Sequence, residues 1–510
     1  MIRSTSLGHP KSLPTIAAPW RKSTTALEVA CLALSMAGAL LGSSYWVHPV
    51  WSFVAFGNYI WLCLLLFRIE PRAVILALPF LISRLSTMVA MIMIEYGAEM
   101  FELGLVGRPG PWSNALNIYH CLFCLGLVAS FKPISRMFDR RRDYPLSAIW
   151  DRYANLLSWL VLGLATLIAL ALIVRGLQAG FPLLAGTDRF FFRRFAADKV
   201  TLYALNFKSA ISYALGFVAF VLPVTRPLRV SAGVMFVATV VLYFLFGDKF
   251  FTQLAAFAAF FGPYLYLNYR RLGRHAWRYA VGGVIALSLA GTVTTYIYSR
   301  GFTETAAATT DRLSGRMVGQ GELWFLQASI GAPMLHWNRP LLERYAEAFT
   351  IKEVDLFALQ NSIGPHYFSN RYAPDYLRAS LHRNAGSVTY TAATEAMGLV
   401  LFGWFGLGVM MFVVGAVVGL ASAYIAFAIE SRSIASGIFA AYINVQLRAS
   451  IVQATPWVIG SIYSMRWLCV ILVFELALLM LGRSAAPLPP GKRMMGKLPR
   501  RTRRPRNVAA

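Results

Sequence analysis

The chain contains a long series of apolar segments, and most of them have the length that crosses a lipid bilayer. A membrane-spanning helix needs roughly 20 apolar residues, because the hydrocarbon core is about 30 Å thick and a helix rises about 1.5 Å per residue. With 57% hydrophobic and 14% charged residues, the chain is too apolar for a soluble domain. We therefore expect an all-α polytopic membrane protein with about twelve transmembrane helices. The predicted spans are 26–47, 50–67, 73–94, 115–131, 156–174, 208–224, 230–246, 250–267, 279–298, 396–429, 434–452 and 457–481.

Basic residues fall mostly in alternate connectors between these spans, and this predicts the orientation of the chain. The net charge is +26, and Lys and Arg gather around 68–72, 132–152, 226–229 and 270–278 and in the tail 483–510. Inward loops of membrane proteins are rich in these two residues. We therefore expect both termini on the cytoplasmic side, and we attribute the positive charge to membrane topology rather than to binding of nucleic acid.

The same pattern divides the chain into five parts. A cytoplasmic segment, residues 1–25, precedes an uncleaved first span, and the first nine spans occupy 26–298 with an outward loop at 175–207. Residues 299–394 form a second outward loop, long enough for a folded layer outside the membrane. Three further spans follow within 395–482. The tail 483–510 is basic and contains several Pro and Gly residues, so we expect a disordered cytoplasmic arm near anionic lipid.

The loop 299–394 carries nine Lys or Arg and eight Asp or Glu, so any anion site within it must be local. Its apolar stretches 321–330 and 341–349 have the pattern of amphipathic helices that lie on the mouth of the bundle. A transporter or flippase seldom needs such a layer, whereas an enzyme acting on a lipid-carried substrate must build a pocket above the lipid surface. The loop therefore favours an enzyme.

Several familiar motifs are better explained by helix packing than by chemistry. The cluster His120-Cys121-x-x-Cys124 lies inside an apolar span, where cysteine is a common buried residue, so we expect no metal site there. All five cysteines lie within apolar runs, which argues against a disulfide in an outward loop. The sequence contains no P-loop, Asp-x-Asp pair or serine-hydrolase elbow. This weighs against an NTP-driven pump and against a metal-dependent nucleotide-sugar transferase, and no cofactor is expected.

Ionisable residues within the predicted spans are the more informative signals, because charge is costly in hydrocarbon. Arg84, Arg448 and Glu475 fall inside spans, and Asp248 and Lys249 fall at an outward turn. One interpretation is structural, with Glu475 pairing one of the two arginines. The other is functional, and it favours Arg448, which has polar neighbours on its own helix.

Arginines in the two outward loops form a second group of candidates. The segment 188–194, Asp-Arg-Phe-Phe-Phe-Arg-Arg, places Arg189 and Arg193 among aromatic residues beside the membrane. Arg312 and Arg316 are four residues apart and share one helical face. The planar guanidinium suits a phosphate or diphosphate. The alternatives that remain are an interfacial anchor for the first segment and a solvated surface helix for the second.

These motifs resemble a known family, the bacterial oligosaccharide repeat unit polymerases of the O-antigen polymerase (Wzy-like) type. The resemblance rests on Gly-Phe-Pro-Leu-Leu-Ala-Gly-x-Asp-Arg at 180–189 and on Arg-Leu-x-x-Arg-x-x-x-Gln-Gly-x-x-x-Phe at 312–325. The run His-Arg-Asn-x-Gly at 382–386 and the layout of about twelve spans are also similar. The resemblance implies a GT-C-like, O-antigen polymerase-ligase architecture. The basic tail 483–510 departs from the family, whose tail is usually shorter.

The resemblance further implies a metal-independent glycosyltransferase of the bacterial inner membrane, acting at its periplasmic face. Such an enzyme transfers a growing glycan from undecaprenyl diphosphate to a lipid-linked repeat unit, for O-antigen, capsule or exopolysaccharide. Guanidinium groups would neutralise the departing diphosphate, and a base would take the proton of the attacking hydroxyl. The candidates for diphosphate binding are Arg189, Arg193, Arg312, Arg316 and Arg448, with Lys249 in support. The candidate bases are His382 or, as alternatives, Glu322 and Glu395.

Two other functions remain open from the sequence. A glycan ligase, which passes the lipid-linked polymer to an acceptor, would use the same arginines and a large outward loop. A flippase or transporter of the lipid-linked sugar would use a central cationic cavity instead. The expected partners are the undecaprenyl-diphosphate-linked glycan, membrane lipid and, in the cell, a chain-length regulator and a flippase.

Overall fold

The computed structural model describes residues 20–100, 103–139, 153–185, 192–247, 250–272, 314–350, 363–375 and 393–455, with a few isolated positions elsewhere. This part of the chain is mostly helical, and seven of its helices are long and apolar enough to cross a membrane. The all-α polytopic class is thus confirmed in outline. The predicted span 279–298 and almost all of 457–481 lie outside the described residues, so they stay predictions.

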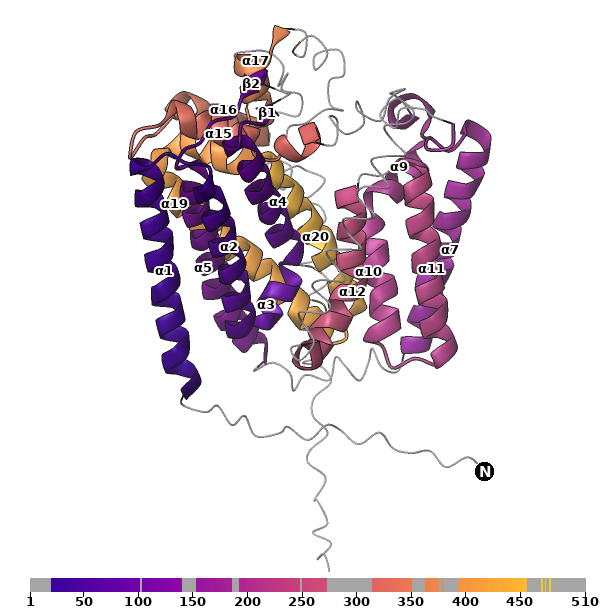
Figure 1. The fold of residues 1–510 in the computed structure, drawn as a ribbon. Coiled ribbons are helices and arrows are strands. Elements are labelled where there is room, and N and C mark those ends of the chain that lie inside the picture. The colour runs from indigo at the N-terminus through magenta and orange to yellow at the C-terminus, as the bar shows by residue number, and fades with distance from the viewer. Residues whose placement is uncertain are drawn as a thin grey trace, which may run out of the picture.

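The helices gather into one bundle with a layer of short elements at one end (Figure 1). The helices are α1 Trp20–Tyr45, α2 Val50–Ile69, α3 Pro71–Leu76, α4 Leu78–Glu95, α5 Trp112–Asp139, α7 Ala154–Ala179, α9 Lys199–Asn206, α10 Lys208–Phe220, α11 Arg226–Leu245, α12 Phe250–Leu272, α15 Glu322–Ile330, α16 Arg339–Thr350, α17 Pro365–Tyr372, α19 Ala393–Glu430 and α20 Ile434–Gln453. Two short antiparallel strands, β1 Glu99–Met100 and β2 Leu105–Val106, join α4 to α5. This hairpin was not predicted.

Two of the predicted spans differ from the observed helices, one because it is divided and one because it is short. The span predicted at 73–94 is divided into α3 and α4 at Ala77, and Pro79 stands in the first turn of α4. Proline lacks the amide N–H and collides with the preceding turn, so it begins a helix more readily than it continues one. The span predicted at 208–224 is α10, whose 13 residues are short for a full crossing.

The helix α9 adjoins α10, with a break at Phe207 between them. Asp198 caps α9, because its carboxylate accepts a hydrogen bond of 2.7 Å from the Thr201 amide. That bond holds the pKa of the Asp198 carboxyl below its ordinary value. The predicted outward loop 175–207 therefore contains a capped helix that leads directly into the bundle.

Helices α5 and α19 pack closely against each other, and glycines make the approach possible. A Cβ atom added at Gly415 would lie 2.0 Å from the Phe123 carbonyl oxygen, and one at Gly126 would lie 2.0 Å from the Phe412 carbonyl oxygen. The Ser130 hydroxyl also donates a 2.8 Å hydrogen bond across the pair to the Ala416 carbonyl. Small residues on facing helices are a common device for close packing in membranes.

The predicted span 396–429 lies within a longer helix that bends near its beginning. Helix α19 contains 38 residues and bends at Gly403, where φ is 71° and ψ is −173°, a conformation reserved for glycine. The Trp404 carbonyl accepts a 3.0 Å hydrogen bond from the Tyr119 hydroxyl, which sets the bend about two turns inside the outward end of α5. The first segment of α19, residues 393–402, is buried almost throughout and lies within the bundle.

The layer at one end of the bundle consists of α15, α16, α17 and the β1–β2 hairpin (Figure 1). The prediction that 321–330 forms an amphipathic helix was wrong, because α15 is buried on nearly every side against α4, α5 and α19. The prediction for 341–349 is confirmed: α16 buries Leu341 and Tyr345, while Arg339 and Glu343 form an exposed ion pair. The layer therefore closes over the bundle through α15.

Candidate functional site

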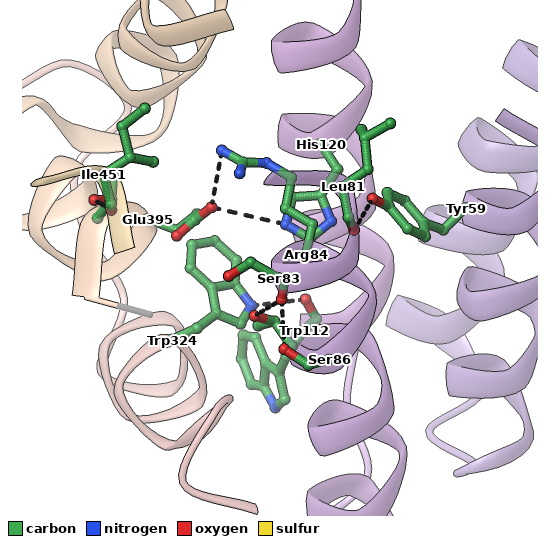
Figure 2. A network of polar contacts seen from close by, with 12 residues as sticks. Tyr59, Leu81, Ser83, Arg84, Ser86, Trp112, His120, Trp324, Glu395 and Ile451 are labelled. Atoms are coloured by element: carbon green, nitrogen blue, oxygen red, sulfur yellow. Dashed lines mark hydrogen bonds and ion pairs between the residues drawn. The ribbon is translucent and has the colours of Figure 1, made fainter. Parts of the chain in front are cut away.

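A buried ionisable cluster lies where α4, α5 and the start of α19 meet (Figure 2). The Glu395 carboxylate, in the first turn of α19, places its Oε1 atom 3.6 Å from Nη2 of Arg84 and 3.8 Å from Nε2 of His120. Arg84 is 3% exposed, His120 is fully buried, and Glu395 is 7% exposed. Two neighbouring helices, α4 and α5, and the distant helix α19 thus bring a carboxylate, a guanidinium and an imidazole together away from water.

Apolar and aromatic groups hold the cluster in place. The Arg84 guanidinium lies over the Phe123 ring, 3.6 Å from its centroid, which is a cation–π contact. The Tyr59 ring meets the His120 ring edge to face at 5.4 Å. The Tyr59 hydroxyl donates a 2.8 Å hydrogen bond to the Leu81 carbonyl, one turn before Arg84 on α4. These contacts orient the two basic side chains and place them in surroundings of low polarity.

The contacts to Glu395 are longer than hydrogen bonds, which rarely exceed about 3.2 Å between heavy atoms. Within the described residues, Nε and Nη2 of Arg84 and both ring nitrogens of His120 make no hydrogen bond. Buried polar atoms are nearly always hydrogen-bonded, because leaving them unpaired costs free energy. Glu395 therefore neutralises charge in the cluster, but these nitrogens retain hydrogen-bonding capacity that no group in the described part of the chain uses.

A second arginine lies close to this cluster. The Thr394 hydroxyl is hydrogen-bonded to the Ile451 carbonyl, which joins the beginning of α19 to α20. Arg448 is three residues before Ile451, so it lies on the same face of α20, one turn away. Its side chain is partly buried. The N-terminus of α19 also adds positive potential here, because helix dipoles point their positive end at the N-terminus.

Aromatic side chains lie beside the cluster (Figure 2). Trp324 of α15 is fully buried, and its Nε1 donates a 2.9 Å hydrogen bond to the Trp112 carbonyl. Its ring lies 5.8 Å from the Tyr119 ring and 6.1 Å from the Trp404 ring, centroid to centroid. Glu322, the first residue of α15, is also fully buried at this junction. The layer and the membrane bundle are thus fastened directly above Glu395.

The structure describes four of the predicted site residues. Glu322 and Glu395 are buried, Arg448 is partly buried near Glu395, and Arg316 is exposed in a helical turn that precedes α15. Arg316 is not brought into the buried cluster. The predicted residues His382, Arg189, Arg312 and Lys249, together with Asp248 and Glu475, lie outside the described residues, as does the side chain of Arg193.

Two members of the cluster were not among the predicted site residues. Arg84 was expected to have a structural or functional role in a span, with Glu475 as its possible partner, but the structure pairs it with Glu395. His120 was treated as a packing residue of a Cys-containing motif. The only sequence signal was a buried-span position for an ionisable side chain, and that signal does not specify a partner more than 250 residues away. In the described part of the chain, no group of three or more His, Cys, Asp or Glu is arranged to hold a metal ion.

Comparison of the chain with protein-family models, curated proteins and solved structures finds no significant match. The resemblance to oligosaccharide polymerases therefore rests on the sequence motifs alone. A function is inferred from the chemistry of the buried cluster and from its place near the layer of short elements at one end of the bundle.

Proposed function

We propose that this protein polymerises undecaprenyl-diphosphate-linked oligosaccharide repeat units at the outward face of the bacterial inner membrane. The observation that carries the proposal is the burial of Glu395 beside Arg84 and His120, beneath the layer that α15 fastens to the bundle. Ionisable side chains inside membrane bundles usually mark a substrate or ion site, because their desolvation is costly. The GT-C-like architecture and the full set of twelve spans belong to this proposal.

The proposed reaction is a metal-independent glycosyl transfer. A sugar hydroxyl of the incoming repeat unit attacks the anomeric carbon of the donor glycan. As that C–O bond forms, the bond between the anomeric carbon and the diphosphate oxygen breaks, and its electron pair leaves with undecaprenyl diphosphate. The hydroxyl proton passes to Glu395, Glu322 or His382. Guanidinium groups stabilise charge that develops on the leaving diphosphate, and the candidates are Arg316 and Arg448 with Arg189, Arg193, Arg312 and Lys249.

Two features of the described residues support this reaction. A site between a membrane bundle and a folded outward layer suits a substrate whose lipid lies in the bilayer and whose sugars project from it. Buried carboxylates on both sides of the junction, Glu322 on α15 and Glu395 on α19, supply candidate proton acceptors. A flippase would have less use for a layer whose helix α15 is locked into the bundle.

The product of a deletion strain tests the proposal. A strain that lacks this protein should decorate its surface acceptor with single repeat units, because export and ligation continue while chain growth stops. Long polymer retained on the lipid carrier would instead identify a ligase. Repeat units trapped inside the cell would identify a flippase.

The exposed arginine Arg316 provides a sharper version of the same test. Arg316→Ala should lower polymer formation by about tenfold or more at a normal protein level, since it removes charge expected to stabilise the leaving group. Arg339→Ala is the matched control, because Arg339 is an exposed arginine of the same layer that pairs only with Glu343 in an i,i+4 contact among the described residues. Equal chain lengths in the two variants would remove Arg316 from the proposed site.

Arg448 is tested by a change that keeps its charge. Arg448→Lys should lose most of the polymer-forming activity while the protein still accumulates, because a lysine cannot reproduce the planar fork of a guanidinium. Arg226→Lys, at the beginning of α11, is the control and should retain activity. Full activity in Arg448→Lys would show that Arg448 supplies only charge or packing.

A further inference from the structure

The Arg84 and His120 side chains carry hydrogen-bonding capacity that no group among the described residues uses. A guanidinium has five N–H donors in a fixed plane, and an imidazole has at least one. Glu395 neutralises Arg84 at 3.6 Å but accepts no hydrogen bond from it, nor one from His120 at 3.8 Å. Both basic side chains are more than nine-tenths buried and point toward the same carboxylate (Figure 2). A structural ion pair alone would be expected to close these gaps.

A phosphate oxyanion suits this arrangement better than the carboxylate does. It presents more acceptor oxygens in three dimensions, and Arg–phosphate contacts are commonly bidentate. The N-terminal end of a helix is itself favourable for phosphate, because its free amides and dipole point toward the anion, and α19 begins beside Glu395. Arg448 lies on α20 one turn from the contact between α19 and α20.

We propose that Arg84 and His120 form a phosphate-binding site and that the Glu395 carboxylate occupies this site while substrate is absent. The ligand is a diphosphate, and its identification as the head group of the lipid carrier rests on the proposed function. The existence of the phosphate-binding site does not depend on the proposed function. Diphosphate binding displaces Glu395 from Arg84, in the way one anion exchanges for another at a shared cation.

The break in α19 gives the carboxylate a way to move. Residues 393–402 precede Gly403, whose positive φ separates them from the spanning part of α19. Backbone hydrogen bonds from His336 to Phe402 and from Asn338 to Leu401 attach the end of this segment to the loop that follows α15. The segment carrying Glu395 is therefore connected to the outward layer, and a shift of that layer moves the carboxylate relative to Arg84.

The exchange links donor binding to proton transfer. A carboxylate that has lost its cation and lies beside a second anion accepts a proton more readily. Glu395 would thus become a competent base only when a diphosphate has taken its place at Arg84. A base that is paired until the donor arrives also protects the donor from premature attack by water.

Binding measurements on the purified full-length protein in lipid nanodiscs test the site. Calorimetric titration would use two probes, inorganic pyrophosphate and farnesyl diphosphate. Glu395→Gln removes the competing charge with little change of shape, so it should bind diphosphate about tenfold more tightly than the original protein. The double variant Arg84→Gln/Glu395→Gln should lose that gain and bind at least about tenfold more weakly than Glu395→Gln.

Glu430→Gln is the matched control. Glu430 also pairs with an arginine inside the bundle, with its Oε1 atom 3.3 Å from Nη1 of Arg72, but at the far end of α19. Removing its charge should leave diphosphate affinity unchanged. A purely structural role for the Arg84–Glu395 pair predicts the opposite sign for Glu395→Gln, namely weaker binding or none, together with a lower melting temperature.

Each outcome decides between these possibilities. Tighter binding of both probes by Glu395→Gln supports a site that recognises the diphosphate itself, and tighter binding of farnesyl diphosphate alone supports a site that also needs the lipid. Unchanged or weaker binding of both probes overturns the proposal. If Glu395→Gln does not accumulate, Arg84→Lys is measured instead. Diphosphate binding by Arg84→Lys as tight as that of the original protein would then overturn the proposal. If the binding test succeeds but the deletion strain still makes full-length glycan chains, the proposed phosphate site stands and the proposed polymerase function is wrong.

Discussion

Two regions of the bundle are packed by different means. In the first, α4, α5 and α19 surround the buried cluster, and 50%, 56% and 50% of their most apolar windows are buried. In the second, α7 and α11 bury only 28% and 33% of theirs. On average the less buried helices are the more apolar ones, so apolar content alone does not decide how closely the helices pack.

The first region is built on glycines and polar side chains. Gly126 and Gly415 bring the backbones of α5 and α19 into contact, and Arg84, His120 and Glu395 lie in the same interface. On α7 and α11, by contrast, a Cβ atom added at Gly163 or Gly233 would meet no atom within 4 Å. An apolar cavity of about 310 Å³ lies between α7, α9, α10 and α20, and stacked rings such as Phe236 and Phe260, 3.9 Å apart, fill the space between α11 and α12.

The two regions should differ in their tolerance of mutations. Lipid tails solvate an apolar helix face about as well as another helix does, so apolar contacts within a membrane need not be close. Charged side chains have no such alternative and must find partners within the protein. The candidate site therefore belongs to the region that is packed most closely, and mutations should separate the two regions.

The largest difference in stability between the two regions is expected when a glycine at a helix crossing is replaced by valine. Gly415→Val forces α5 and α19 apart, because even a Cβ atom there would lie 2.0 Å from a carbonyl oxygen, and we expect a loss of more than about 4 kcal/mol of stability. Gly163→Val on α7 is the control, since no atom lies within 4 Å of a Cβ placed there. Quantifying both proteins in the membrane fraction checks the prediction, and equal levels would contradict it.

The next largest effect concerns the charge of the buried cluster. Arg84→Leu leaves Glu395 without its cation, and breaking a buried ion pair in this way costs about 3 kcal/mol or more. Arg84→Leu/Glu395→Leu should recover much of the thermal stability in detergent. The same experiment on Arg72 and Glu430 should give a smaller loss, because these side chains are 28% and 14% exposed. If the double variant is no more stable than Arg84→Leu, the unpaired charge of Glu395 is not the cause of the lost stability.

A smaller effect is expected at the bend of α19. Gly403→Ala strains a backbone with φ of 71° and brings a Cβ atom to 2.3 Å from the Pro333 carbonyl oxygen. We expect a loss of about 2 kcal/mol, concentrated in the outward layer. Faster proteolysis of the loop around 331–338 from the outside, with unchanged protein in the membrane, would confirm it. Gly233→Ala, where a Cβ atom meets nothing within 4 Å, should leave the rate unchanged.

The smallest effect is expected in the apolar cavity. Ala204→Leu adds atoms to a wall of the cavity. The free energy of unfolding, followed through the melting temperature, should therefore change by no more than about 1 kcal/mol. Ala90→Leu adds the same atoms in the first region, where Ala90 is fully buried and its Cβ lies 3.0 Å from the position of a Cβ at Gly321. That change should cost about 2 kcal/mol. Equal melting temperatures for the two variants would remove the contrast between the regions.

Much of the class of this protein could be predicted from its apolar segments. The positions of α2, α5, α7, α11 and α20 agree closely with predicted spans, because each is a long apolar run without a strong helix breaker near its centre. The errors are local and have local causes. Pro79 divides one predicted span, and Gly403 permits a bend that separates a buried segment from the spanning part of α19. Hydrophobicity alone does not distinguish a helix in lipid from a buried one such as α15.

The candidate site depended on the tertiary structure to a much greater degree. From the sequence it followed that Arg84 and Arg448 needed partners, since an ion in hydrocarbon is too costly to leave alone. The sequence also placed Arg448 on a polar helix face and arginines in the outward loops. Only the fold decided that Arg84 and His120 meet at Glu395, because a desolvation cost requires some partner of opposite charge without specifying which one. The choice was made by the glycine-mediated contact of α5 with α19, which fixes the distance between elements that are far apart in the chain.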